Sequence, residues 1–321
     1  MTRTRPSCVV LLVLATALGC QSVRPEASGH PLAGRIYDGR AGAFVTDAEL
    51  YSRAAATELV LLGEKHDNPE HHRLQASVID AIAESGRRPA VVWEMITRDR
   101  DPVLRSFSSV GSGDLAELAQ RLEWSKSGWP EWEMYQPIAE AAQRHGLVMV
   151  AGDLAGETRS RLHHAGFDGL RADERSALRL DGSVPDPVYA VLAETIERAH
   201  CGHAMQEHLP RMVEVQHARD AQLALSLREA VTSVAGGGVL IAGTGHVDRN
   251  IAVPRFLLGR DVLVVAFVEV TAGETAPERY AAQNAVDLIW FTERVDSVDP
   301  CEAFREQLEE HFAPQDERQE A

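Results

Sequence analysis

The stretch ELVLLGEKHDNPEHH, residues 58–72, places an apolar run directly before a group of acidic and histidine side chains. The apolar part, residues 59–63, is continuous rather than alternating, which is typical of a strand buried on both faces. The polar part supplies acid–base groups and metal-ligand types: Glu64, His66, Asp67, His71 and His72. We therefore predict a buried strand whose end delivers side chains to a functional site.

Similar apolar runs recur along the chain, separated by longer mixed segments. They cover residues 90–95, 147–152, 238–243, 262–270 and 286–291. Between them, Asn68 and Pro69 are typical of a helix start, and Gly146 is typical of a helix end. This alternation predicts an α/β fold with a mainly parallel central sheet, helices on both faces, and a helical insertion at about residues 155–237.

The N-terminal sequence MTRTRPSCVVLLVLATALGCQS is typical of a secretory signal. Its apolar run is too short for a stable membrane span. The ending ALGC resembles the bacterial lipobox, which implies cleavage before Cys20 and lipid attachment there; an ordinary signal peptide is the alternative. Gln21 after the cysteine favours the outer membrane, on either its periplasmic or its outer side. A lipid anchor would then hold the protein at the bilayer.

We predict four regions from these patterns. Residues 1–19 are the signal peptide, 20–45 a lipid-anchored tether, 46–300 the α/β domain, and 301–321 a polar C-terminal tail. The formal net charge of −16 in 321 residues argues against binding nucleic acid through phosphate neutralisation. Cys201 and Cys301 could pair in an oxidising compartment, but their spacing does not decide this.

Polar side chains follow four of the predicted strands: Glu64 and His66, then Glu94, then Asp153, then His246 and Asp248. The carboxyl ends of parallel strands share one edge of the sheet, so these groups are expected to meet. Two of the turns are Gly-x-x-His, in which we expect the glycine to allow a sharp turn. His66, His246 and Glu94 would form a metal set, with Glu64 or Glu94 as general base of a hydrolase. Structural histidines bonded to loop backbone are the alternative.

Other polar and aromatic groups have less certain roles in the sequence. His71 and His72 are expected to face solvent or to support the site rather than to bind a metal. His200 and His203, with Cys201, are of types that bind haem iron, or they are incidental loop residues. The aromatic stretch at residues 124–135 predicts a flat apolar ligand, a partner surface or a satellite core. Arg219 and Asp220 form either a buried pair or an exposed one. The nucleophile-elbow, Walker and dinucleotide glycine motifs do not occur.

Taken together and in order, these motifs resemble a known family. They are LLGEKHDNPEHHRLQ, VVWEM, WPEWEMYQPIAEAA, AHCGH with MVEVQHARDAQLA, and AGTGHVDRNIAVP, over roughly residues 55–270. The chain resembles the ChaN-like haem-binding lipoproteins, in a superfamily with the Tiki/TraB proteins and erythromycin esterases. It departs at VAGDLAGE, where an Asn followed by Pro and a basic residue is usual at 153–155.

The resemblance implies an outer-membrane lipoprotein of haem and iron uptake, with haem held between two protomers of a homodimer. It implies a tyrosine as iron ligand, for which Tyr135 and Tyr189 are the candidates. The Tiki/TraB relatives imply metal-dependent hydrolysis by His66, His246 and Glu94 instead. Three functions therefore remain open: a haem-binding protein, a metal-dependent hydrolase, and an interaction protein without chemistry of its own.

Overall fold

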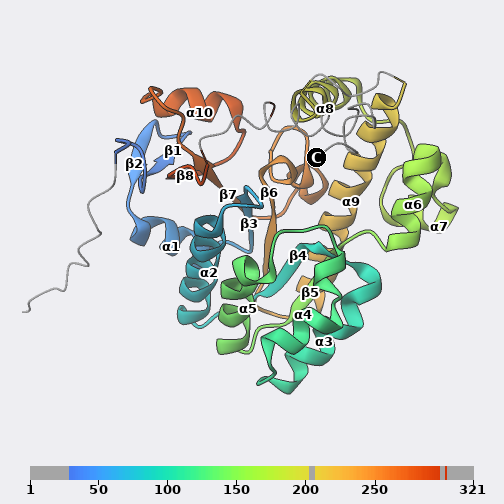
Figure 1. The fold of residues 1–321 in the computed structure, drawn as a ribbon, viewed down its shortest axis with the longest axis horizontal. Coiled ribbons are helices and arrows are strands. Elements are labelled where there is room, and N and C mark those ends of the chain that lie inside the picture. The colour runs from blue at the N-terminus through green and yellow to red at the C-terminus, as the bar shows by residue number, and fades with distance from the viewer. Residues whose placement is uncertain (1–28, 202–206, 297–300, 302–321) are drawn as a thin grey trace, which may run out of the picture.

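The computed structural model describes residues 29–201, 207–296 and 301. The predicted signal peptide, the lipidation site Cys20, His203 and residues 302–321 lie outside the described residues. The predicted α/β fold is confirmed: an eight-stranded sheet runs in the order β2-β1-β8-β7-β3-β6-β4-β5, and Figure 1 shows helices packed around it. The strands are β1 (Ile36–Asp38), β2 (Ala43–Val45), β3 (Leu59–Glu64), β4 (Ala90–Thr97), β5 (Met149–Asp153), β6 (Gly238–Gly243), β7 (Val262–Glu269) and β8 (Leu288–Thr292).

The six apolar runs predicted as strands form the parallel part of the sheet, β3 to β8. The other two strands lie within the predicted tether. Residues 36–45 form β1 and β2, which join the sheet edge antiparallel through β8. This part of the tether prediction is wrong because two strands of three residues carry no apolar run long enough to be recognised. Tyr37 nevertheless packs into a small core beside Phe291.

The two faces of the sheet bury different side chains of the same strand, as the alternation of a strand requires. On one face, Val60 and Leu62 pack with α1 (Asp47–Ala56), α2 (Pro69–Glu84), α3 (Asp101–Val110), α4 (Leu115–Arg121) and α5 (Trp132–Arg144). On the other face, Leu59 and Leu61 pack with α9 (Leu209–Ser233) and the short helix η5 (Val253–Leu257). Helices therefore cover both faces of the sheet.

The segment between β5 and β6 contains no strand among its described residues. It holds α6 (Gly156–Ala165), η3 (Gly166–Gly169), α7 (Ala172–Ala177), α8 (Asp186–Ala199) and α9, which share a separate apolar core. Three further short helices, η1 (Arg98–Arg100), η2 (Trp124–Lys126) and η4 (Thr244–His246), follow β4, α4 and β6, and α10 (Pro277–Gln283) precedes β8. None of the helices in the described ranges is long and apolar enough to cross a membrane.

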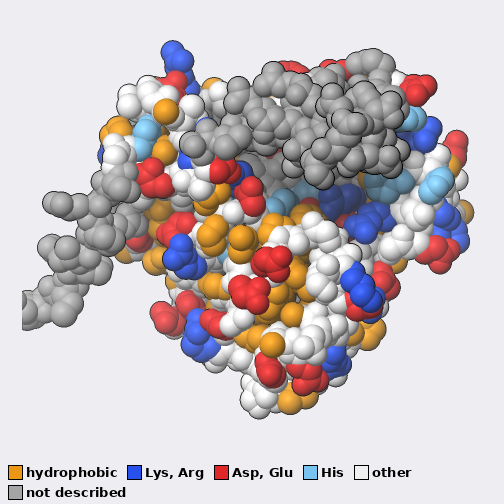
Figure 2. Space-filling view, viewed as in Figure 1, with side chains coloured by type: hydrophobic (Ala, Val, Ile, Leu, Met, Phe, Trp, Pro, Cys, Tyr) orange, Lys and Arg blue, Asp and Glu red, His pale blue; other side chains and the backbone are white. Residues whose placement is uncertain are grey.

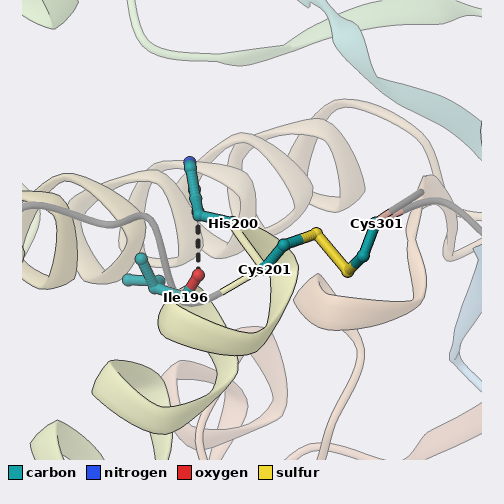
Figure 3. Close-up of a disulfide and its surroundings, with 4 residues drawn as sticks. All are labelled: Ile196, His200, Cys201 and Cys301. Carbon is teal, nitrogen blue, oxygen red and sulfur yellow. Dashed lines mark hydrogen bonds between the residues drawn. A yellow bond between two sulfur atoms is a disulfide. The ribbon is translucent and has the colours of Figure 1, made fainter. Parts of the chain in front are cut away.

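The structure pairs Cys201 with Cys301, a question that their spacing left open. Their sulfurs are bonded and their Cα atoms lie 5.4 Å apart, across a sequence separation of 100 residues. Figure 3 shows the bond at the end of α8, directly after His200. The disulfide therefore ties the end of this insertion helix to a residue that follows the last strand.

Candidate functional site

The winding of the sheet reverses beside β3, and this places three strand ends together. From β3 the chain passes to β4 and β5, returns to place β6 between β3 and β4, and then crosses to β7 on the other side. Ligands of open α/β folds bind at such a switch point, outside the carboxyl ends of the strands. Here Glu64 ends β3, and the turn that leads to His246 follows β6. Glu94, predicted to end its strand, lies within β4, which continues to Thr97.

Glu64 ends β3 in the interior, with imidazoles on both sides. Its Oε1 accepts from Nδ1 of His66 at 2.9 Å, and its Oε2 lies 3.2 Å from Nε2 of His72. Tyr135 stacks on His72, with ring centroids 4.0 Å apart, and its hydroxyl lies 3.3 Å from Nδ1 of His66. Burial alone would raise the pKa of Glu64, but the two imidazoles lower it to about 2. Glu64 is therefore a fixed anion that orients His66.

His71 and His72 are both fully buried, so they do not face solvent. His72 contacts Glu64, as a supporting residue would. His71 accepts at Nδ1 from the backbone N–H of Lys65 and lies 2.8 Å from Thr292 through Nε2. Burial lowers the pKa of His71 to about 3, so its ring is neutral and joins β3 to β8.

A second buried network centres on Glu94. Its Oε1 accepts from Arg219 at 2.8 Å and lies 3.1 Å from Nε2 of His246, while its Oε2 accepts from the backbone N–H of Gly243 at 2.7 Å. Arg219 also donates through Nε to both oxygens of Asp153, each at 3.1 Å. Nδ1 of His246 lies 2.6 Å from Asp220. Arg219 and Asp220 thus have different partners, Arg219 with Glu94 and Asp153 and Asp220 with His246. Asp153, where the sequence departs from the family pattern that it resembles, supplies one partner of Arg219.

The charges of this network stabilise one another. Burial would raise the pKa of Glu94, but His246 and Arg219 hold it well below its usual value. Burial would likewise lower the pKa of His246, but Glu94 and Asp220 raise it to about 9. For Asp220, burial itself raises the pKa, to about 6. At neutral pH His246 is therefore a cation held between two acids.

The structure brings His66, Glu94 and His246 into one crevice, since Nε2 of His66 lies 4.0 Å from Oε2 of Glu94. The predicted divalent metal ion nevertheless gains no support. Among residues 29–201, 207–296 and 301, no group of three or more His, Cys, Asp or Glu side chains could hold a metal ion. The physical reason is Arg219, whose guanidinium already lies between Glu94 and Asp153. The catalytic roles predicted for Glu64 and Glu94 depended on that metal and stay predictions.

The glycines of the two Gly-x-x-His turns serve close packing. Gly63 and Gly243 are the final or penultimate residues of their strands, and neither has a positive φ. A Cβ on Gly243 would lie 2.7 Å from Nε2 of His66, and one on Gly63 would lie 3.1 Å from Cα of Thr244. Neither glycine is therefore required for a left-handed backbone conformation. Only glycine lets the two turns and the His66 ring approach this closely.

The aromatic stretch divides between core and site. Trp124, Trp132 and Tyr135 are buried in the main core, rather than in the satellite core that was one of the expectations. Trp129 is only partly buried and packs on His66, with ring centroids 4.7 Å apart. It also lines the largest cavity near the sheet edge, so this one aromatic is available to a ligand.

That cavity has a volume of about 710 Å³ and lies between Trp129, α6, the end of α8 and α9. Figure 2 shows histidine and Lys/Arg side chains gathered at the middle of this face, beside α6 and α9. The volume is within the range of small-molecule and cofactor sites. The lining residues are Trp129, Gly156, Arg159, Ser160, His163, His164, Ile196, His200, Met212, Val215, Gln216 and Arg219.

Two histidines that line this cavity, His164 and His200, are each held by a hydrogen bond from Nδ1 to a backbone carbonyl. Nδ1 of His164 donates to the carbonyl of Ser160 at 2.7 Å, and Nδ1 of His200 donates to the carbonyl of Ile196 at 2.8 Å, as Figure 3 shows. A carbonyl only accepts, so the proton must lie on Nδ1 and the lone pair on Nε2. Metal-binding histidines are oriented in this way, by a hydrogen bond from their other nitrogen.

The four side chains predicted to bind haem iron lie in different places. His200 lines the cavity, and His203 lies outside the described residues. Tyr189 packs against the core of the insertion. Tyr135 is fully buried, and burial with the nearby Glu64 strongly raises its pKa, which opposes the phenolate that would bind iron. Sequence reasoning missed His164, although paired histidines near a helix end were a visible signal.

Comparison with known proteins relates the fold to one family. The sequence model of the family described as haem-binding uptake, Tiki superfamily, ChaN matches residues 50–257. The structure of cofacial heme binding to ChaN of Campylobacter jejuni is similar, with a TM-score of 0.64 and 19% identity over 79% of this chain and 95% of that chain. At this identity the likeness shows a shared fold. No curated protein matches the chain.

Two further solved structures are more distantly similar. The type III effector HopBA1 has a TM-score of 0.43 and 15% identity, over 76% of this chain and 91% of that chain. An erythromycin esterase mutant in its open conformation has a TM-score of 0.40 and 14% identity, over 87% of each chain.

Proposed function

This chain belongs to the haem-binding uptake family ChaN of the Tiki superfamily, and we propose that it binds haem in the cavity between Trp129, α6, α8 and α9. Membership of the family supports haem as the ligand. The observation that supports this placement is that His164 of α6 and His200 at the end of α8 both line the cavity, each with Nδ1 bound to a backbone carbonyl.

The residues present fit a haem group chemically. Neutral imidazole is a common axial ligand of haem iron. Trp129, Ile196 and Val215 supply apolar surface for the porphyrin plane. Arg159 lines the cavity with its side chain 38% exposed, and its Nη1 lies 3.5 Å from Oδ2 of Asp153. Its remaining N–H groups can donate to a propionate carboxylate. Arg219 donates to both Glu94 and Asp153, so we assign the propionate contact to Arg159.

We assign the iron ligand to His200, with His164 as the second candidate. His200 lies beside Cys201, whose disulfide bond fixes the end of α8, and this limits the orientations open to the ring. The tyrosine ligand implied by the family resemblance is less compatible with this chain, because Tyr135 is buried and Tyr189 packs in the insertion core.

The proposal includes a homodimer and an uptake role at the outer membrane. The Campylobacter ChaN protein binds heme cofacially, and His164 and His200 of this chain are both exposed, so a haem held here would keep one face near solvent. Covering that face with a second protomer would bury apolar surface. The lipobox-like ALGC and its Cys20 support lipid anchoring of such a protein. Replacing Cys20 by Ser should then release it from the membrane fraction.

A haem titration tests the placement. Wild-type protein should give a saturable shift of the haem Soret band with the spectrum of an imidazole-bound haem, and sedimentation should show the mass rising. His200→Ala should change the ligand-field spectrum and weaken binding at least tenfold. His208→Ala, an exposed histidine that does not line the cavity, is the matched control. An unchanged spectrum in both His200→Ala and His164→Ala would remove these ligands from the proposal.

A further inference from the structure

A second, smaller cavity lies where the loop after α7 meets α8, α9 and η5. Its volume is about 200 Å³, and it shares no lining residue with the proposed haem cavity. It is smaller than the usual range for cofactor sites, so a porphyrin does not fit it. Its polar lining side chains are Arg179, Ser183, His217 and Arg255.

His217 is the buried side chain of this cavity. The residue is 6% exposed, and its ring lies between Phe167 and Phe256, with centroid distances of 6.4 and 5.1 Å. Its Nδ1 is buried without a hydrogen-bond partner in the described part of the chain. Buried polar atoms are nearly always hydrogen-bonded, so this nitrogen has the capacity to bind a ligand atom.

The arginines around His217 form a local excess of positive charge in an acidic protein. The formal net charge of the chain is −16, yet neither Arg179 nor Arg255 forms an ion pair with a carboxylate of the described residues. Arg255 donates only to the backbone carbonyl of Asn250, at 3.1 Å. Arg179 also lies close enough to Arg228 to lower the pKa of that guanidinium, though burial lowers it more. Repulsion among these cations is relieved by a bound anion.

We propose that this cavity binds a small phosphoryl oxyanion, with Arg179 and Arg255 as charged donors and His217 as a buried N–H donor. A phosphoryl group offers more acceptor oxygens than a carboxylate, which matches two guanidinium groups and an imidazole. The ligand is inorganic phosphate or the phosphate of a small monoester, since both present the same oxygens. Nothing in this proposal depends on haem binding.

The backbone conformation of Arg179 allows a substitution that separates an effect on stability from an effect on phosphate binding. Its φ is +59°, a left-handed conformation that glycine adopts more readily than arginine. Arg179→Gly should therefore raise the unfolding temperature in phosphate-free buffer, because it relieves the backbone, while it weakens phosphate binding at least tenfold. If Arg179 had only a structural role, Arg179→Gly would change the unfolding temperature but leave phosphate binding unchanged. Arg73→Gln, at an exposed ion pair on α2, is the control and should bind phosphate as the wild type does.

Calorimetric titration of the full mature chain with inorganic phosphate, glycerol phosphate and acetate shows whether the cavity binds the free ion, a phosphate monoester or any small anion. Saturable binding of phosphate alone supports a free-ion site, and tighter binding of glycerol phosphate supports a monoester site. Binding of acetate as tightly as of phosphate overturns the phosphoryl class, and binding of none of the three overturns the site.

The imidazole of His217 gives a second readout that does not depend on the arginine variants. Burial and the charge of Arg255 lower its pKa to about 4 in the free protein. Arg179 faces it from the loop, and Phe167 and Phe256 enclose it. Saturating phosphate should raise this pKa by at least one unit, measured by the NMR shift of the ring carbon. An unchanged His217 titration in the presence of bound phosphate would place the anion elsewhere.

Discussion

At the carboxyl edge of the sheet, Glu94, Arg219 and His246 are partners of one another, whereas the cavity beside α6 and α8 keeps Nε2 of His164 and His200 without a partner among the described residues. The same residue types therefore serve two purposes. A buried charge must be paired to be tolerated, so a saturated network holds strand ends together. An exposed imidazole held by one hydrogen bond keeps a lone pair for a ligand. Chemically suggestive side chains identify a binding site only when their bonding capacity is unfilled.

Removing Arg219 should produce the largest change. Arg219→Met removes the guanidinium that the buried carboxylates of Glu94 and Asp153 share, and leaves His246 beside Glu94 and Arg159 beside Asp153. The free energy of unfolding should fall by about 3–5 kcal/mol. Arg198→Met removes an arginine from an exposed ion pair with Glu194 and should change stability by less than about 1 kcal/mol. Urea denaturation of both variants measures the difference. Equal stability of the two would mean that the network is not structural.

The pH dependence of stability should separate Glu64 from the rest of the network. Its folded pKa is lowered from 4.5 to about 2, so its stabilisation is present above pH 4.5 and is lost as pH falls towards 2. The loss relative to Glu64→Gln should be up to about 3 kcal/mol. The stabilisation by His246 has the opposite pH dependence. Its pKa is raised from 6.5 to about 9, so this stabilisation is present below pH 6.5 and is lost as pH rises through 9. Parallel stability–pH curves for wild type and Glu64→Gln below pH 4.5 would contradict this assignment.

The close approach at Gly243 should have a smaller effect. Gly243→Ala forces a Cβ to within 2.7 Å of the His66 ring, which should cost about 1–3 kcal/mol through overpacking. Gly245→Ala, two residues later in the same turn, meets no atom within 4 Å and is the matched control. Thermal unfolding compares them. A Gly245 variant as unstable as the Gly243 variant would show that turn conformation matters more than packing.

The cavity histidines should have the smallest effect on stability. His164→Ala and His200→Ala remove exposed rings that, within the described ranges, make one hydrogen bond each, to the preceding helical turn. The stability of haem-free protein should therefore change by less than about 0.5 kcal/mol. Urea denaturation without haem measures this. A loss of unfolding free energy comparable to that of Arg219→Met would show that these histidines stabilise the fold. The contrast between the saturated network and the cavity would then not hold.

Much of the fold followed from local pattern, but the partners of the site did not. The six apolar runs identified the parallel strands, because a strand buried on both faces must be apolar along its length. Strand ends identified Glu64, Glu94 and His246 as neighbours, because parallel strands share an edge. The same reasoning predicted that these side chains bind a metal ion. It could not show that a guanidinium occupies that place, because Arg219 stands 125 residues after Glu94 and spacing in the sequence does not bring them together.

The sequence by itself therefore determined the elements, the edge of the sheet that carries polar groups, and the family. Only the tertiary structure decided which of those groups are already satisfied, that Gly63 and Gly243 serve close packing, and that His164 and His200 share a cavity with Trp129. The physical reason is the range of the interactions. Helix and strand formation depends on near neighbours in the chain, whereas hydrogen bonds, burial and open ring nitrogens depend on which distant segments pack together.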